Sequence, residues 1–443
     1  MTFTVADGAQ ADLAAAWART AAAVQDAAHR AVARDADAAH VYAQARGALI
    51  VDFDEHGERG SYHGIEGMTL SGLASRREHA VAGLGGHAPS GPGGFGGDAY
   101  AGVLDELLAA VAAVRDRAGG VSVHGRVFVL LESIAAYRRG GPVRSADRHR
   151  SRLLLWAGPV FAGPAFTGTR LPLDAVGAAA DEAVAASRLH AVRVPPPEGE
   201  TVVLVAPACA GVLLHELCGH LLEADVFRHP GNRLRALMGR RISHPRLTVV
   251  DDSADPSSWA GLRADDHGNP GRAVTLLDSG HVAGTLTSGA LTPAGGPSMD
   301  QVPGAAGDPG GHARRADYRY AALPRMTTMS VLPGADSAPG VLADVRDGVY
   351  AEAIGRATCD PVTGRFVAQV DLARRIRDGR LCEPLSPVHV TGDVVEALSS
   401  IRAVCDDPAV YDTGCVKQQQ TVANRNIAPT LLLTGISCAP RAT

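Results

Sequence analysis

Apolar and polar residues recur with a helical period in the first part of the chain, and strand-like runs follow. Residues 10–46 contain neither proline nor glycine and predict one long amphipathic helix. Residues 49–53 then predict a short strand. Later apolar runs predict two more helices, at 100–117 and 174–187. They also predict two strands, at 126–134 and 152–157, which flank a turn-rich segment and form an antiparallel hairpin.

The pattern changes after three consecutive prolines at 195–197, where we place a boundary between two domains. A β-branched run at 201–206 predicts a strand, and an apolar helix is expected from Cys209 onward. Short strands and turns predominate after that helix. The sequence thus predicts an α+β fold. The N-terminal α/β domain, 1–197, has long helices and an antiparallel sheet, and the C-terminal domain, 198–443, is mainly β with one buried, metal-binding helix.

Two segments rich in glycine and proline interrupt these patterns. Residues 83–97 and residues 292–311 are expected to form loops, because such composition provides no apolar face to pack.

The apolar helix that starts at Cys209 contains an unusual cluster of ionisable residues. His215, Glu216, His220 and Glu223 lie within a stretch that is otherwise apolar on nearly every side, which is typical of a buried helix. Buried ionisable groups are costly unless they are paired or bind a metal. The cluster therefore predicts a metal site, with a set of internal salt bridges as the alternative.

The spacing of the two histidines makes a prediction about the backbone. The familiar zinc-peptidase motif is His-Glu-x-x-His, but His215 and His220 are five residues apart. On a regular helix that separation places them about 140° apart, on different faces. They can converge on one ion only if the helix is widened or broken, for example by a π-turn. Gly219, directly before the second histidine, would permit either distortion.

Glu216 directly follows the first histidine, so its carboxylate can lie beside the ion without binding it. A carboxylate in that place can act as a general base toward water whose pKa a metal has lowered.

Composition and charge exclude several classes of protein. The net charge of −5 leaves no basic stripe for nucleic acid, and no apolar run is long enough to cross a membrane. The seven cysteines are an odd number and are scattered, which argues against a disulfide framework and predicts a reducing, cytoplasmic location. The N-terminal stretch lacks the pattern of a secretory signal peptide. Only one of the 42 basic residues is a lysine, Lys417.

The block VVLVAPACAGVLLHELCGHLLEAD, residues 202–225, resembles the motif of the TldD/PmbA family of metallopeptidases, also called modulators of DNA gyrase. That motif has a strand, a small-residue lead-in and then His-Glu-x-x-x-His-x-x-Glu-x-Asp. DDHGNPGRAVTLLDSGHVAGTLTS and GHARRADYRYAALPRMTTMSVLPG resemble further blocks of the family and follow in the same order. The resemblance covers about 200–435; the N-terminal half agrees only in outline.

The resemblance implies a two-domain, dimeric, cytosolic zinc peptidase that acts on small or unfolded peptides, with one Zn²⁺ per chain. It also implies a homodimer, or a heterodimer with a family member that lacks the motif; this chain carries the motif and so resembles the active subunit. The third family ligand is a cysteine near the C-terminus, in a Cys-x-Lys context that here corresponds to Cys415 and Lys417. A His₂Cys set with an open position suits catalytic zinc, and the alternative for Cys415 is a small core residue.

The chain departs from the family after that cysteine, where Val416 and Gln419 replace glycines. Side chains therefore stand where the family has bare backbone, so the range of substrates can be narrowed or shifted.

Other candidates come from the matched blocks. Glu223 can orient a histidine ligand or pair with an arginine. Arginine forks pair with carboxylates and carbonyls. The blocks therefore suggest a set of peptide-binding residues: His312, Arg314, Arg315, Arg325 and, beside the cysteine, Lys417. The alternative is that these residues have ordinary structural or surface roles.

The sequence therefore predicts a zinc peptidase with His215, His220 and Cys415 as ligands and Glu216 as general base. Extended peptides would bind by adding to a sheet edge. The alternative is a family member that binds a peptide or a partner protein and cleaves it weakly or not at all. Direct contact with DNA or with a membrane is not expected.

Overall fold

The computed structural model describes residues 7–34, 38–72, 78–82, 97–289 and 310–441. Most of the two predicted glycine-rich loops, 83–97 and 292–311, lies outside these residues. The fold is mixed α+β, as predicted, and its C-terminal part is rich in strands. Among the helices that are described, none combines the length and apolar content that a bilayer crossing needs.

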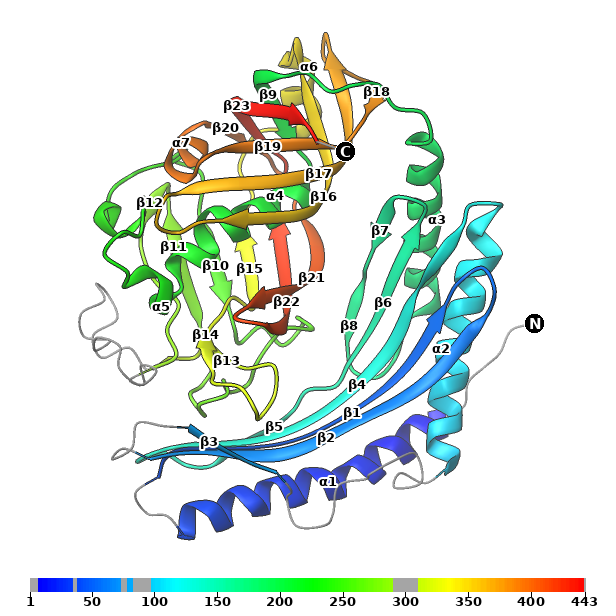
Figure 1. Ribbon diagram of the computed structural model, residues 1–443, viewed down its shortest axis with the longest axis vertical. Coiled ribbons are helices and arrows are strands. Elements are labelled where there is room, and N and C mark those ends of the chain that lie inside the picture. The colour runs from blue at the N-terminus through cyan, green and yellow to red at the C-terminus, as the bar shows by residue number, and fades with distance from the viewer. Residues whose placement is uncertain (1–6, 35–37, 73–77, 83–96, 290–309, 442–443) are drawn as a thin grey trace.

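The N-terminal part is one antiparallel sheet of eight strands covered by three helices (Figure 1). The strands run in the order β3-β2-β1-β4-β6-β7, with β5 beside β4 and β8 beside β6. The elements are α1 (Asp7–Arg34), β1 (Ala38–Phe53), β2 (Glu58–Gly72), β3 (Glu78–Ala82), α2 (Gly97–Ala118), β4 (Val123–Arg138), β5 (Arg144–Asp147), β6 (Arg150–Ala157), β7 (Val160–Ala162), β8 (Ala165–Thr167) and α3 (Leu173–Leu189).

The prediction of a single helix over 10–46 is wrong beyond Arg34, because β1 occupies the last nine of those positions. The strand is buried on both faces. Ala43 and Ala45 pack in the core under the helices, while Tyr42 and Gln44 face the C-terminal part. A strand covered on both sides loses the apolar–polar alternation that identifies strands, and its alanines favour a helix.

The C-terminal part consists of two main sheets and a small hairpin. One sheet has the order β12-β11-β10-β15-β22-β21, and the other has β16-β9-β23-β19-β17-β18 with β20 beside β23. The strands are β9 (Gly199–Val205), β10 (Val249–Asp252), β11 (Ala273–Asp278), β12 (His281–Val282), β13 (Ala313–Arg314), β14 (Leu323–Pro324), β15 (Thr328–Val331), β16 (Asp347–Cys359), β17 (Arg365–Arg377), β18 (Arg380–Leu385), β19 (Val388–Asp393), β20 (Ile401–Val404), β21 (Ala409–Lys417), β22 (Gln420–Ala428) and β23 (Leu431–Pro440).

The helices of this part are short: α4 (Pro207–Leu214), α5 (Ala224–Phe227), α6 (Ala338–Asp344) and α7 (Val394–Ser399). Helix α4 lies between the two main sheets, against β16 of one sheet and against β21 and β22 of the other. Its buried side chains belong to the large apolar core of the C-terminal part. A second large apolar core lies between the N-terminal sheet and its helices. The division into domains 1–197 and 198–443 stays a prediction.

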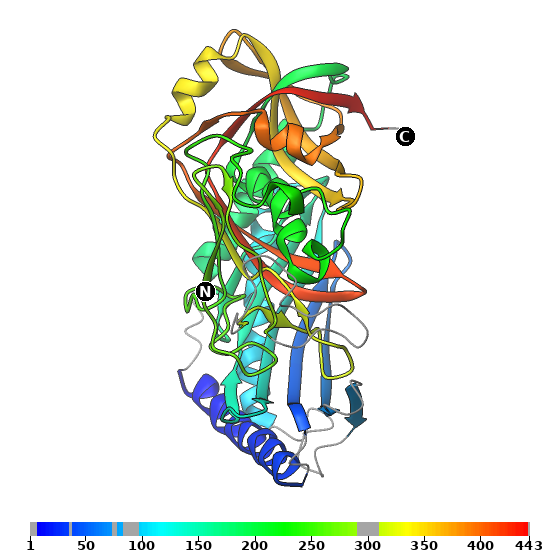
Figure 2. The ribbon, with the colours of Figure 1, turned by 90° about the vertical axis from the view of Figure 1, so that its left-hand side faces the viewer.

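The two parts are stacked along the long axis of the molecule, with α1 near one end and α6 near the other (Figure 2). Buried polar groups join them. Glu132 of β4 accepts hydrogen bonds from Gln44 (2.6 Å) and Arg46, and Arg46 also donates to the carbonyl of Ala316 (2.6 Å). Arg148 pairs with Asp266 at 2.8 Å. Buried charges that are paired in this way hold two surfaces in one register.

Candidate metal centre

The helix that carries both histidines is irregular where the spacing predicts irregularity. Helix α4 ends at Leu214 and continues as a π-turn over His215–Gly219, in which the His220 N–H donates to the carbonyl of His215. A short 3₁₀ turn then ends at Glu223, whose backbone is extended. The prediction of a distorted backbone is confirmed.

Gly219 is closely packed at the end of the π-turn. A Cβ atom at this position would lie 2.0 Å from the sulfur of Met326, which is itself buried. A side chain at position 219 therefore fits only if the buried Met326 side chain shifts or adopts another rotamer.

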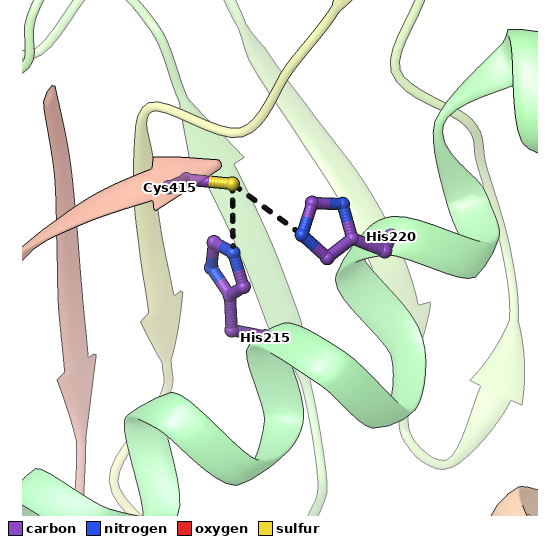
Figure 3. A group of neighbouring side chains, drawn as sticks. All are labelled: His215, His220 and Cys415. Carbon is purple, nitrogen blue, oxygen red and sulfur yellow. Dashed lines mark hydrogen bonds between the residues drawn. The ribbon is translucent and has the colours of Figure 1, made fainter. Parts of the chain in front are cut away.

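The π-turn brings both imidazoles to the same thiol (Figure 3). His215 Nε2 and His220 Nε2 each lie 3.3 Å from Cys415 Sγ. The cysteine comes from β21, 200 residues beyond His215 in the chain. The two rings are nearly perpendicular, with centroids 4.8 Å apart. Among the described residues, these three form the one group of histidine, cysteine and acidic side chains with ligand atoms close enough to share an ion.

The electrostatics of this group favour a thiolate. Burial opposes ionisation of Cys415, which is only 5% exposed, but the charges of His220 and His215 outweigh burial and lower the pKa of the thiol well below its usual value. Burial likewise opposes protonation of the two imidazoles, and the Cys415 thiolate raises the pKa of His215. Deprotonated sulfur is the form that binds metals.

The donor set fits zinc. Two imidazole nitrogens and a thiolate are the ligand types that Zn²⁺ prefers, and three protein ligands leave a position open. His220 uses Nδ1 for a 2.8 Å contact with the Glu223 carboxylate, which leaves Nε2 directed at the cysteine. A carboxylate on the outer nitrogen is a common support for a histidine ligand. His215 Nδ1 is buried and has no hydrogen-bond partner among the described residues.

Glu216 lies beside the three candidate ligands and stays unengaged. It makes no hydrogen bond or ion pair within the described part of the chain, and it lines the same cavity as His215, His220 and Cys415. Burial raises the pKa of its carboxyl group. A partly buried carboxylate without a partner, facing a cavity, is available to accept a proton.

The cavity lies between the two parts of the molecule and has a volume of about 790 Å³. The C-terminal part contributes the π-turn and residues of β16, β17 and β21. The N-terminal part contributes Leu154 and Trp156 from β6 and Phe161 from β7. We did not predict these last three from the sequence. The alternation along β6, where Leu153 and Leu155 are buried and Trp156 is exposed, was the available signal.

Glu223 connects the histidines to the single lysine. Its carboxylate contacts His220 and accepts from Lys417 Nζ at 2.8 Å, and Lys417 also donates to Asp225 at 2.7 Å. Arg325 Nε lies 4.0 Å from the same carboxylate. The close cationic partner of Glu223 is thus Lys417, whereas we considered an arginine. The support of a histidine ligand by Glu223 stays a prediction.

The other residues from the matched blocks are buried among groups of the chain itself. Arg325 is fully buried and donates to the carbonyl of Cys415 at 2.7 Å. Arg314 donates to the carbonyls of Met326 and Ala423. His312 is fully buried, 3.2 Å from Asp251, and Arg315 donates to the carbonyl of Tyr320. The structure thus places Arg325 next to the cysteine and gives Arg314, Arg315 and His312 internal partners.

Comparison with known proteins relates the C-terminal part to a family. A family model described as the PmbA/TldA metallopeptidase C-terminal domain matches residues 198–440. A metalloprotease TldD homologue from Haemophilus influenzae is 29% identical over 246 residues, 55% of this chain and 49% of the relative. A zinc metalloprotease TldD homologue from Saccharolobus solfataricus is 29% identical over 236 residues, 53% of this chain and 50% of the relative. The chain spans about half the length of the curated relatives it matches.

Solved structures share the fold along nearly the whole chain. TldE from Thermococcus kodakarensis superimposes with a TM-score of 0.70 at 15% identity, over 93% of this chain and all of that one. A putative modulator of a DNA gyrase from Thermotoga maritima gives a TM-score of 0.69 at 13% identity, over 94% of this chain and 99% of that one. At such identities the likeness concerns the fold alone.

Proposed function

The chain belongs to the TldD/PmbA family of metallopeptidases, and on that premise we propose that it is a zinc-dependent peptidase that cuts small or unfolded peptides. The observation that carries the proposal is the meeting of His215, His220 and Cys415 at the wall of an open cavity, with an unengaged Glu216 beside them. We further propose one Zn²⁺ per chain, held by these three residues, and a peptidase domain that spans 198–443.

Each protein group in this site has a chemical task. Zinc, when bound, supplies Lewis acidity that polarises a carbonyl and lowers the pKa of water. Glu216 accepts the proton of the attacking water and delivers it to the leaving amine. Burial raises the pKa of this carboxyl group, which suits a residue that must both take up and release a proton.

The edge of β21 offers a place for an extended peptide. β21 is the last strand of its sheet and turns into β22 through Gln418 and Gln419, both with positive φ. In a hairpin closed by two residues, the flanking Lys417 and Gln420 form a hydrogen-bonded pair. The alternation then directs the backbone groups of Gly414 and Val416 to the free edge. A peptide that adds to this edge lies next to Cys415.

The assignments of four residues change in this proposal. Lys417 and Arg325 are held by internal partners next to the candidate ligands, so we propose that they position the site instead of binding a peptide. His312 and Arg314 lie in the same buried surroundings and receive the same proposal. Dimerisation and a motif-lacking partner subunit stay predictions.

Removal of metal is expected to abolish cleavage reversibly. Dialysis against a chelator should stop hydrolysis of an unfolded peptide mixture, and stoichiometric zinc should restore it. The metal-free protein should also unfold at a lower temperature, because a ligand present at about 1,000 times its Kd stabilises the folded state by about 4 kcal/mol. Mass spectrometry of the digest measures cleavage, thermal denaturation measures the unfolding temperature, and elemental analysis of the protein verifies the metal content. Cleavage that survives complete removal of metal contradicts the proposal.

Loss of the lysine should weaken metal binding. Lys417→Met leaves the Glu223 and Asp225 carboxylates without their cation, and breaking a buried ion pair costs about 3–5 kcal/mol. We expect zinc affinity to fall about 10- to 100-fold, as for loss of other groups that support a ligand. Competition with a chromophoric chelator measures the affinity. Lys417→Arg, which keeps the charge, is the matched variant and should lose less; equal losses would contradict a role for the charge.

The alternative is a family member that holds a peptide without cutting it efficiently. The observation in its favour is Val416, which is 65% exposed at the cavity where the family has glycine. Zinc bound at one per chain without any cleavage product would select this alternative.

A further inference from the structure

We propose that the cavity contains a subsite for one large apolar or aromatic side chain of the peptide, built by Leu154, Trp156 and Phe161 of the N-terminal sheet. This inference rests on the proposed function and specifies its substrates: peptides in which such a residue lies close to the cleaved bond.

The wall follows from the alternation of side chains along β6. Leu153 and Leu155 are fully buried in the core beneath the helices, so Leu154 and Trp156 point to the opposite face of the sheet and line the cavity. Trp156 is 36% exposed, whereas Trp17 and Trp259, the other two tryptophans, are almost completely buried. Leaving a large aromatic side chain exposed to water in a cavity is energetically unfavourable, and such exposure is typical of a binding site.

The indole is held in place before any ligand arrives. The ring of His124, on the neighbouring strand β4, is parallel to it within 6°, with centroids 5.5 Å apart. Phe161 of β7 lies against it at 5.0 Å and 49°. Because three strands fix these rings, a ligand that binds them pays little entropy for ordering the surface.

Strand β16 lines the same cavity with small and apolar side chains, Ala353, Ile354 and Ala357. Arg356 and Thr358 of this strand also line the cavity. At about 790 Å³, the cavity has room for a large side chain. An aromatic or large aliphatic side chain buried there would gain about 10- to 100-fold in affinity over a small polar one.

The charged residue of the β6 wall has internal partners and is not available to a ligand. Arg152, on the same face of β6, is 6% exposed and donates to the carbonyls of Gly163 (3.3 Å) and Asp412 (2.7 Å). Its guanidinium also lies 4.7 Å from the ring centre of Trp259. The wall built by β6 and β7 therefore offers apolar contact and no available cation of its own. Arg356, exposed on β16, and Asp371 of β17 also line the cavity, so the apolar preference is assigned to the β6 and β7 wall alone.

The subsite is continuous with the site of chemistry. The same cavity is lined by His215, Glu216 and Cys415, and by Gly414 and Val416 of the free edge of β21. A strand added to that edge points alternate side chains to opposite faces, so one of them can enter the apolar wall while the backbone stays at the candidate ligands. We therefore expect the subsite to bind the side chain of a peptide residue close to the cleaved bond.

The test uses the zinc-loaded full chain and a mixture of unstructured peptides whose cut sites are identified by mass spectrometry. Wild type should cut preferentially where a large apolar or aromatic residue lies within two positions of the bond. Trp156→Ala should lower kcat/KM at those bonds at least tenfold through KM, and change cleavage at bonds flanked by small polar residues less than twofold. Trp156→Phe should keep the preference. Val192→Ala, an exposed apolar position outside the cavity, is the matched control.

A second readout separates this inference from the proposed function. Binding of a phenylalanine-containing peptide to wild type should change the tryptophan fluorescence, and a serine analogue should not, whether or not either peptide is cut. Uniform loss of cleavage at all bonds in Trp156→Ala, or equal binding of the two peptides, overturns the subsite. Absence of any cleavage together with selective binding overturns the peptidase and leaves the subsite supported.

Discussion

Replacing Glu216 with glutamine is expected to abolish peptide hydrolysis while zinc stays bound. The amide keeps the shape of the side chain but cannot accept a proton, and loss of a general base costs about 10²- to 10⁴-fold in rate. Glu216 has no hydrogen bond or ion pair of its own among the described residues, so the substitution breaks no internal contact.

Folding should not suffer from this change. Burial raises the pKa of the Glu216 carboxyl group, so the ionised form is disfavoured by its surroundings and a neutral amide removes that cost. The thermal midpoint of Glu216→Gln should therefore equal or exceed that of wild type. Thermal denaturation measures the midpoint, kinetics on one defined peptide measure hydrolysis, and elemental analysis measures bound zinc. Activity within tenfold of wild type, at full zinc content, would contradict the assignment of Glu216 as the general base.

Replacing Cys415 with serine is expected to remove the metal. The thiolate is the softest of the three donors, and a serine hydroxyl does not ionise at neutral pH. Loss of a group that only supports a ligand lowers metal affinity up to about 100-fold. We expect loss of the ligand itself to lower zinc affinity by more than that, and hydrolysis to fall with it. Competition with a chelator and cobalt substitution, where the thiolate gives its own absorption band, report the loss independently of activity.

The matched control is another free thiol of the same chain. Cys382→Ser changes a partly buried cysteine of β18 whose contact is with the carbonyl of Arg380 and which does not line the cavity. It should keep zinc and activity at wild-type level. If Cys415→Ser keeps its zinc, the metal is held elsewhere and the proposed ligand set is wrong.

How much of this site the sequence predicts depends on how local its parts are. His215, Glu216 and His220 lie on one short apolar segment, so both the cluster and the need for a distorted backbone can be read from spacing alone. The π-turn over His215–Gly219 confirms that prediction. Cys415 is different: no spacing rule links it to the histidines, and only the family resemblance pointed to it.

Other features depend on tertiary packing, which no local pattern reveals. The alanine-rich start of β1 favours a helix in isolation and becomes a strand because layers cover both its faces. Trp156 could be assigned to a strand, but its place opposite the candidate ligands follows from how the N-terminal sheet meets the C-terminal part. Arginine usually lies on the surface, but Arg325 is buried and donates to the carbonyl of Cys415.

The burial of the candidate ligands between two parts joined by buried charges determines what a substrate must do to reach them. His215 and Cys415 are each 5% exposed, so a peptide bond held inside another folded domain cannot be presented to them. Cutting then requires the substrate to open first, and its rate follows the equilibrium population of the open form. Every 1.4 kcal/mol of substrate stability should slow cleavage about tenfold. Such an enzyme distinguishes proteins by how well they are folded before it distinguishes them by sequence.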